Sequence, residues 1–233
     1  MMAEGVFFDV GNTLLYPYPS VSEVCRGVLR SAGHDRDLDS IEQIMPLVDA
    51  YYEDRYREDD TFWTDEGETS SVWVGMYSLL CRRLGIAEEA EVLARRVYDE
   101  FGRPDRWRVY DDVFPALQRL KERGIKTGII SNWDRRLPVL LEGLGFRDLV
   151  DVVISSAVVG LRKPDPRIFE LACSTLGVTP TKSVHVGDHH YSDILGASSV
   201  GMRAVLIDRH GAQVTAAALS SLDALESYLG WEV

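Results

Sequence analysis

Short apolar runs alternate with helical segments over residues 109 to 209, and this alternation is the strongest constraint on the fold. An apolar run without a polar face is typical of a strand buried on both sides, as in a parallel sheet. Strands that alternate with helices predict right-handed βαβ units. We therefore expect an α/β chain with a doubly wound, Rossmann-like parallel sheet. Its strands are expected at residues 5–10, 126–130, 150–154, 183–186 and 203–207.

Two helices between these runs have predictable ends. Asp111 or Asp112 can cap a helix that Gly124 ends, because short polar side chains accept from free N–H groups and glycine tolerates the conformation after a helix. Pro166 opens a second helix, and Gly177 ends it. Ligands of such a sheet bind beyond the carboxyl ends of its strands, so functional residues are expected there.

Residues 16–107 break the alternation. Apolar residues follow helical spacing in four segments of this stretch, and Pro46 bends or restarts one of them. No convincing strand lies here. We predict an all-helical cap inserted after the first strand, with residues 16–107 as the cap and residues 1–15 with 108–233 as the core domain.

Charge and composition exclude several partners. The net charge is -12 and no run of Lys and Arg forms a basic patch, so neither nucleic acid nor an anionic membrane is an expected partner. No apolar run approaches the roughly 18 residues that span a bilayer, and the start of the chain shows no secretory signal. Cys25, Cys81 and Cys173 lie far apart, as is typical of reduced thiols, so we expect a cytoplasmic protein.

Polar clusters follow four of the expected strands. In a parallel sheet these loops open on one edge, so residues far apart in sequence converge there. Each cluster alone is consistent with an ordinary turn or surface loop. Four at one edge indicate a functional site. The clusters are residues 9–14, 131–132, 163–166 and 187–193.

The acidic residues of these clusters suit a magnesium ion. Mg²⁺ prefers hard oxygen ligands, usually one or two carboxylates with waters and phosphate oxygens. Asp9 and Asp188 can supply carboxylates, and Gly11 can supply its backbone carbonyl oxygen. Asp193 can orient a water bound to the ion. A carboxylate beside the ion can attack phosphorus, so Asp9 is a candidate nucleophile that forms an aspartyl phosphate.

The remaining clusters suit a phosphate group. Lys163 can offset the charge on nucleophile and phosphate, which makes it a candidate catalytic residue. Ser131 and Asn132 are candidate substrate-binding residues beside it, since hydroxyl and N–H groups donate to phosphoryl oxygens.

Together these motifs resemble the haloacid dehalogenase superfamily over nearly the whole chain. Asp9 matches the family nucleophile, Ser131 the second motif, Lys163 the third, and Asp188 with Asp193 the fourth. The resemblance implies subfamily I with a C1 helical cap, Mg²⁺ as cofactor and a small phosphorylated substrate. Two stretches look like the REG-2-like group, which includes haloacid-dehalogenase-like hydrolase domain-containing 3 proteins: residues 130–137 and 163–169.

One position departs from the family pattern. Phosphatases of this superfamily carry a second Asp two residues after the nucleophile, which serves as general acid and then as base. Here that position is Gly11. A positioned acid or base contributes roughly 10²- to 10⁴-fold in rate, so we predict a competent Mg²⁺ and phosphate site with impaired proton transfer. His189, His190 and Asp134 are candidate substitutes, although each is equally consistent with an ordinary loop residue.

Three functions follow from this departure. The first is a phosphatase that is slow or favours good leaving groups, and retention of the nucleophile and its partners favours it. The second is a 2-haloacid dehalogenase, although typical dehalogenases lack the Gly-Asp-x4-Asp motif at 187–193. The third is a phosphate-binding or regulatory protein. A phosphonoacetaldehyde hydrolase needs a cap lysine and is disfavoured, because the lysines all lie outside the predicted cap: Lys121, Lys126, Lys163 and Lys182.

The loop at 59–66 joins two predicted cap helices and is both acidic and aromatic. It either faces the site or packs Phe62 and Trp63 into the cap. If it faces the site, its charge disfavours polyanionic substrates unless Arg55 and Arg57 offset it. Trp133 is a candidate for the rim of the pocket.

Overall fold

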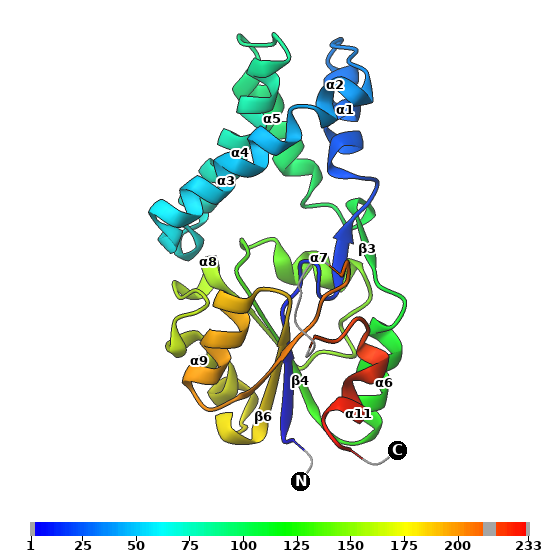
Figure 1. The fold of residues 1–233 in the computed structure, drawn as a ribbon, viewed down its shortest axis with the longest axis vertical. Helices are drawn as coiled ribbons and strands as arrows, with labels where there is room; N and C mark the ends of the chain where they lie inside the picture. The colour runs from blue at the N-terminus through cyan, green and yellow to red at the C-terminus, as the bar shows by residue number, and fades with distance from the viewer. Residues whose placement is uncertain (1–2, 212–217, 232–233) are drawn as a thin grey trace.

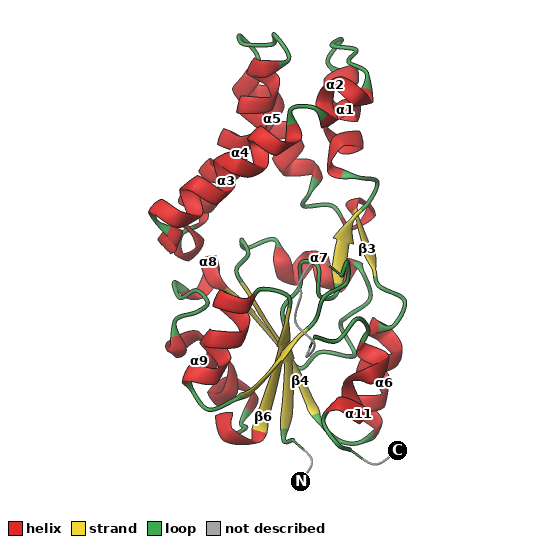
Figure 2. Cartoon of the chain, viewed as in Figure 1, coloured by secondary structure: helices red, strands yellow, loops and turns green. Residues whose placement is uncertain are grey.

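A five-stranded parallel sheet forms the centre of the molecule. The computed structural model describes residues 3–211 and 218–231. The strands follow the order β5-β4-β1-β6-β7, and every neighbouring pair is parallel (Figure 2). The doubly wound α/β prediction is therefore confirmed. The strands are β1 (Gly5–Phe8), β4 (Lys126–Ser131), β5 (Val152–Ser155), β6 (Ser183–Gly187) and β7 (Arg203–Leu206).

The apolar character of β1 follows from its central place in this sheet. Side chains alternate between the two faces of a strand, and helices cover both faces here (Figure 1). On one face, Phe8 belongs to the same hydrophobic cluster as Leu117 of α6 (Val113–Glu122). On the other face, Phe7 belongs to a second cluster, with Phe169 of α9 (Pro166–Leu176). Both phenylalanines are fully buried, so neither face of β1 has room for a polar side chain.

Helices of the sheet region begin and end near their expected positions. Asp165 caps α9 by accepting from the Arg167 N–H, and Gly177 follows the helix with φ +67°. The larger helices and turns here are α6 (Val113–Glu122), α7 (Leu137–Gly143), α8 (Ser156–Val159), α9 (Pro166–Leu176), η3 (Pro180–Lys182), η4 (His190–Leu195), α10 (Gly196–Ser199), η5 (Leu222–Ala224) and α11 (Leu225–Tyr228).

Asp112 precedes α6 as expected, but its side chain makes no capping bond. Its carboxylate instead accepts from Arg209 at 2.5 Å, from the Ser221 hydroxyl at 2.7 Å and from the Leu222 N–H at 2.7 Å. The capping interaction expected from the sequence is therefore wrong at this residue. The charged Arg209 side chain and the Leu222 N–H, both distant in sequence, satisfy the Asp112 carboxylate better than an N–H group at the start of α6 would.

Helices occupy most of the segment between β1 and the rest of the sheet. They stand together beyond one end of the sheet in Figure 1. Pro46 lies in the first turn of α3, so a helix restarts there, which is one of the two outcomes expected from the sequence. The elements are α1 (Val21–Ser31), α2 (Leu38–Glu42), α3 (Met45–Glu58), η1 (Asp60–Thr64), α4 (Glu66–Arg83), α5 (Ala90–Glu100) and η2 (Pro104–Arg106).

A two-stranded antiparallel ribbon joins these helices to the sheet region. It consists of β2 (Leu15–Pro17) and β3 (Trp107–Val109). The expectation that no strand lies within 16–107 is therefore wrong. Each strand has only three residues, and the two strands are separated in sequence by the whole inserted segment. No local sequence pattern therefore reveals the pairing. The division into core (1–15 and 108–233) and cap (16–107) stays our proposal, with both boundaries inside the ribbon.

The three cysteines are free and buried, as expected. None of the helices in the described ranges is long and apolar enough to cross a membrane.

We predict that Gly128→Ala destabilises the fold. A Cβ atom at this position of β4 would lie 2.6 Å from Phe7 Cδ1 and 2.9 Å from Val152 Cγ1. Crowding of a packed core costs about 1–3 kcal/mol in the free energy of unfolding, measurable by denaturant titration. The control is Gly27→Ala in α1, where nothing lies within 4 Å of the new atom. Equal stability of the two variants would contradict this packing.

Candidate functional site

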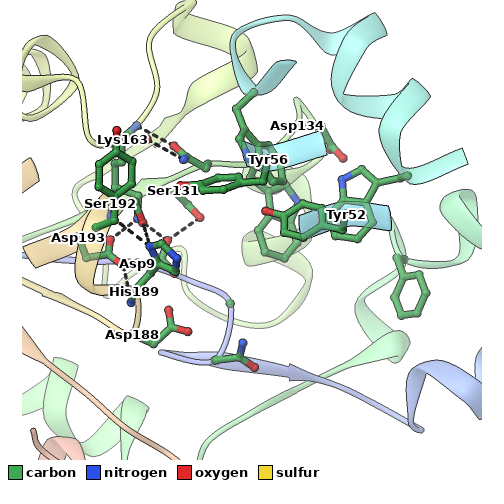
Figure 3. A pocket seen from close by; sticks show the side chains of 18 of the residues that line it. Asp9, Tyr52, Tyr56, Ser131, Asp134, Lys163, Asp188, His189, Ser192 and Asp193 are labelled. Atoms are coloured by element: carbon green, nitrogen blue, oxygen red, sulfur yellow. Dashed lines mark hydrogen bonds and ion pairs between the residues drawn. The ribbon is translucent and has the colours of Figure 1, made fainter. Parts of the chain in front are cut away.

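Three carboxylates meet at the carboxyl edge of the sheet. Asp9 follows β1, and Asp188 and Asp193 follow β6. One carboxylate oxygen from each lies within 4.8 Å of the others (Figure 3). The structure thus brings together the acidic residues that the sequence singled out, because β1 and β6 are hydrogen-bonded neighbours in the sheet.

Asp9 is held in place by two donors and by its own backbone. Its N–H donates to the Val186 carbonyl at 2.9 Å, which extends the pairing of β1 with β6. Its Oδ1 accepts from the Ser131 hydroxyl at 2.9 Å and from Lys163 Nζ at 2.6 Å. Asp9 is only 8% exposed. These contacts fix the carboxylate and direct positive charge toward it.

Lys163 is the positive centre of the site. Its side chain is 2% exposed, and Nζ also donates to Asp193 Oδ1 at 2.5 Å. Burial favours the neutral amine, but the charges of Asp193 and Asp9 outweigh that effect and raise the pKa of Lys163 above its usual range. The lysine is therefore charged at neutral pH, as its proposed role requires.

Asp193 is engaged through both of its oxygens. Besides Lys163, Oδ1 contacts His185 Nε2 at 2.8 Å, and Oδ2 accepts from the His189 N–H at 3.0 Å. Burial opposes ionisation, but Lys163 and His185 lower the pKa of Asp193 below its usual range. Gly187 makes room for this carboxylate, since a Cβ there would lie 2.2 Å from Asp193 Cγ.

His185 is a site residue that the sequence analysis missed. It lies within β6, is fully buried, and has its ring edge-on to Phe169 at 5.2 Å. Burial lowers the pKa of His185, so it is neutral at neutral pH and donates to Asp193 through Nε2. A lone histidine inside an apolar strand gives no sequence signal for this role.

Asp188 differs from the other two carboxylates because it is half-buried rather than buried. Thr13 Oγ1 donates to its Oδ1 at 3.5 Å. Burial and the charge of Asp9 raise the pKa of Asp188 to about 7. Three carboxylates against one lysine leave an excess of negative charge. An oxygen donor set with this charge fits a hard divalent cation.

Asn132 secures the loop that carries Lys163. Its Oδ1 accepts from the Lys163 N–H at 2.8 Å, and its Nδ2 donates to the Lys163 carbonyl at 3.0 Å. Both ends of the amide are thereby used, so Asn132 positions the lysine. Its assignment to substrate binding stays a prediction.

A cavity of about 580 Å³ opens above these residues. Gly11, Asp9, Asp188 and Asp193 lie on its wall at the sheet edge, together with Ser131, Asn132 and Lys163. The cap contributes the opposite wall, largely aromatic, with Tyr52, Tyr56, Trp63 and Trp73. Trp133 also lines the cavity, as the sequence analysis suggested.

A family model described as a haloacid dehalogenase-like hydrolase matches residues 3–201. The chain belongs to the haloacid dehalogenase-like hydrolases. Haloacid dehalogenase-like hydrolase domain-containing protein 3 of Danio rerio is 32% identical over 213 residues, which cover 90% of this chain and 87% of that relative. This hydrolase therefore falls in the domain-containing protein 3 group.

Two further relatives carry phosphatase names. Glyceraldehyde 3-phosphate phosphatase of Methanopyrus kandleri is 32% identical over 219 residues, covering 89% of this chain and 85% of that protein. The crystal structure of a haloacid dehalogenase-family phosphatase from Thermococcus onnurineus is 29% identical. It aligns with a TM-score of 0.65 over 98% of this chain and 99% of the other.

The cap loop of this hydrolase combines the two expected arrangements. Phe62 and Trp63 are buried in an aromatic cluster of the cap, and Trp63 also lines the cavity. Asp60 pairs with Arg162 of the sheet region, whose Nε donates to the Asp60 carbonyl at 2.9 Å. Arg162 therefore offsets the charge of Asp60. Hydrogen bonds from Thr61, and then the charges of Arg162 and Arg55, lower the pKa of Asp59 in the same loop.

Two of the three candidate substitutes for the missing acid have other partners. Asp134 accepts from Arg136 at 2.6 Å and from the Tyr98 hydroxyl at 3.1 Å, and it is 2% exposed. His189 lines the cavity, and its Nδ1 accepts from the Ser192 N–H at 3.1 Å. His190 is not among the residues that line the cavity.

We predict that Lys163→Met destabilises the protein by about 3–5 kcal/mol at neutral pH, because it leaves Asp9 and Asp193 buried without their cation. Loss of the cation raises the pKa of Asp193, so the variant's folded state binds more protons than its unfolded state. Its stability therefore recovers as the pH falls toward about pH 5. Denaturant unfolding at both pH values measures the effect.

The matched control is Lys182→Met, whose lysine is 56% exposed and pairs with Glu4. An exposed pair contributes about 1 kcal/mol or less, so this variant should resemble the parent protein. A Lys163 variant as stable as the Lys182 variant would show that the buried lysine does not compensate the carboxylates.

Proposed function

We propose that this hydrolase is a Mg²⁺-dependent phosphatase that acts on a small phosphate ester through an aspartyl phosphate at Asp9. The observation that carries the proposal is the buried Asp9 carboxylate, held by Ser131 and Lys163 and grouped with Asp188 and Asp193. The names of the phosphatase relatives support the same reaction class.

The carboxylates and one backbone carbonyl are the proposed ligands of the ion. Asp9, Asp188 and the Gly11 carbonyl would hold Mg²⁺, and Asp193 would orient water beside it. The ion supplies positive charge that offsets the substrate phosphate. Three carboxylates gathered around one lysine leave an excess of negative charge, which supports a cation at this position.

The side chains divide the remaining work. Both donors to Asp9 bind Oδ1, so Oδ2 keeps lone pairs that face neither Ser131 nor Lys163. Lys163 is held rigidly by Asp193 and Asn132, so it can neutralise a phosphoryl oxygen without rearranging. Ser131 can transfer its hydroxyl hydrogen bond from Asp9 to the phosphoryl group. The cap wall of the cavity would limit access of water.

Gly11 lies two residues after the nucleophile and has no side chain. It therefore supplies no acid to protonate the leaving-group oxygen. Asp134 is held by Arg136 and Tyr98, and His190 is not among the lining residues, whereas His189 lines the cavity with its ring beside Tyr56. The proposed enzyme therefore favours esters whose alcohol leaves without being protonated.

The free, buried thiols of the protein support the prediction that it works in a reducing cytosol.

We expect Mg²⁺-dependent hydrolysis of para-nitrophenyl phosphate, with a rate reduced by at least about 10³-fold in Asp9→Asn, because the amide is not a nucleophile. Phosphate release measures turnover.

Excess Mg²⁺ should also raise the melting temperature of the parent protein but not that of Asp188→Asn.

Two outcomes would redirect this proposal. Stabilisation by Mg²⁺ and phosphate without turnover across a broad ester panel would identify a phosphate-binding protein. Metal-independent halide release from a 2-haloacid would identify a dehalogenase.

We expect Gly11→Asp to increase hydrolysis of benzyl phosphate, a substrate with a poor leaving group, by roughly 10²-fold, since the new carboxyl group can protonate the departing oxygen. The position has space, because the nearest atom to a Cβ there is Trp133 Cζ3 at 3.8 Å. Gly11→Asn is the matched control, similar in shape but without the acid. Equal rates in the two variants would show that proton transfer does not limit this enzyme.

A further inference from the structure

We propose that the substrate is the phosphate monoester of an uncharged aromatic alcohol, whose ring lies against Tyr52, Tyr56, Trp63 and Trp73, here called the aromatic wall. This inference rests on the proposed phosphatase function and specifies its leaving group. Figure 3 shows Tyr52 and Tyr56 on the cap side of the pocket, with Asp9 and its partners on the other side.

Neighbouring rings hold the aromatic wall in place. Tyr52 of α3 stacks on Trp73 of α4 with ring centroids 5.7 Å apart, and Tyr56 lies 5.9 Å from Tyr52. Trp63 of η1 meets Trp73 edge-on at 6.1 Å. Tyr52, Tyr56 and Trp73 are only half-buried although they line the cavity. Ring surface thus remains for a ligand ring to contact.

Aromatic side chains also line the cavity from outside the aromatic wall. Trp107 of the ribbon and Trp133 after β4 have ring centroids 5.1 Å apart, and Phe101 lies 5.9 Å from Trp107. All three line the same cavity. Its volume, about 580 Å³, is in the range of small-molecule sites. A flat apolar group of one or two rings suits this space.

The charges of the cavity disfavour an anionic leaving group. Among its described lining residues the cations are Lys163, Arg136 and Arg57. Each already faces a carboxylate: Lys163 faces Asp9 at 2.6 Å, Arg136 faces Asp134 at 2.6 Å, and Arg57 faces Asp54 at 3.3 Å. Glu53, another lining residue, also pairs with Arg57 at 3.6 Å. A second phosphate or a carboxylate on the substrate would have to displace one of these partners.

The missing acid at Gly11 independently favours an aromatic alcohol. A phenol has a pKa near 10, as in tyrosine, so it leaves as the phenolate far more readily than an alkyl alcohol leaves as the alkoxide. An Asp9 oxygen forms a bond to phosphorus while the bond from phosphorus to the aryl oxygen breaks, and the electron pair stays on that oxygen. Water then cleaves the aspartyl phosphate, and its protons pass to phenolate and phosphate. The products are the phenol and inorganic phosphate.

Four phosphates separate ring binding from leaving-group chemistry. They are β-naphthyl, phenyl, benzyl and acetyl phosphate, assayed with Mg²⁺. The β-naphthyl ester should exceed the phenyl ester in kcat/KM by about tenfold, because the second ring buries more apolar surface against the aromatic wall. The phenyl ester should exceed the benzyl ester in kcat by roughly 10²-fold, because only the benzyl alcohol needs an acid to leave.

Variants of the aromatic wall test where the ring binds. Tyr56→Leu and, separately, Trp73→Leu should each lower the ratio of kcat/KM for β-naphthyl phosphate to kcat/KM for acetyl phosphate by about tenfold, mainly through KM of the naphthyl ester. Tyr51→Leu, on the same helix but outside the cavity lining, is the matched control and should leave this ratio unchanged. Melting temperatures establish that each variant is folded.

A binding measurement complements turnover. β-Naphthylphosphonate, which has no ester bond to cleave, should bind about tenfold more tightly than methylphosphonate by calorimetry, and Tyr56→Leu should remove that difference. Turnover of acetyl phosphate without preference for aryl esters or aryl phosphonates would overturn the aromatic-substrate inference and leave the phosphatase proposal intact. Failure with all four phosphates, acetyl phosphate included, would overturn the phosphatase proposal itself.

Discussion

A buried ammonium group holds the polar end of this sheet together. Lys163 Nζ lies 2.6 Å from Asp9 and 2.5 Å from Asp193, so one cation joins the loops that follow β1 and β6. Buried charges are tolerated only when they are paired. The segment before α9 must therefore bring its lysine to this point, and Asn132, after β4, fixes the lysine backbone there. The loops after β1 and β6 and the segment before α9 therefore meet at one point, because their buried charges must be paired.

The sheet edge and the cap present opposite chemistry to the same cavity. The edge supplies fixed charges and hydrogen-bond donors, which suit a phosphoryl group and a metal ion. The cap supplies rings held by other rings, such as Tyr52 on Trp73, which suit an apolar leaving group. Gly11 lies on the wall of this cavity beside Trp133. Loss of an acid there and the aromatic surface nearby point to the same kind of ester.

The sequence was informative where a residue type answers a local requirement. The apolar run of β1, the proline and glycine at the ends of α9, and the acidic residues after β1 and β6 are of this kind. It was uninformative where the partner is remote. The β2–β3 ribbon pairs across the whole cap, Asp112 meets Arg209, and His185 meets Asp193 from inside an apolar strand. These contacts form only once the chain has folded.

The ribbon also has an architectural consequence. Because Pro17 pairs with Trp107, the points where the chain leaves for the helices and returns from them are adjacent. The inserted helices are therefore attached to the sheet region through one short antiparallel ribbon. The length and shape of this insertion can change without altering the register of the five-stranded sheet, because the central strand β1 ends before the insertion begins. A fold built in this way can change the aromatic wall of its cavity while the carboxylates and the lysine at the sheet edge stay in place.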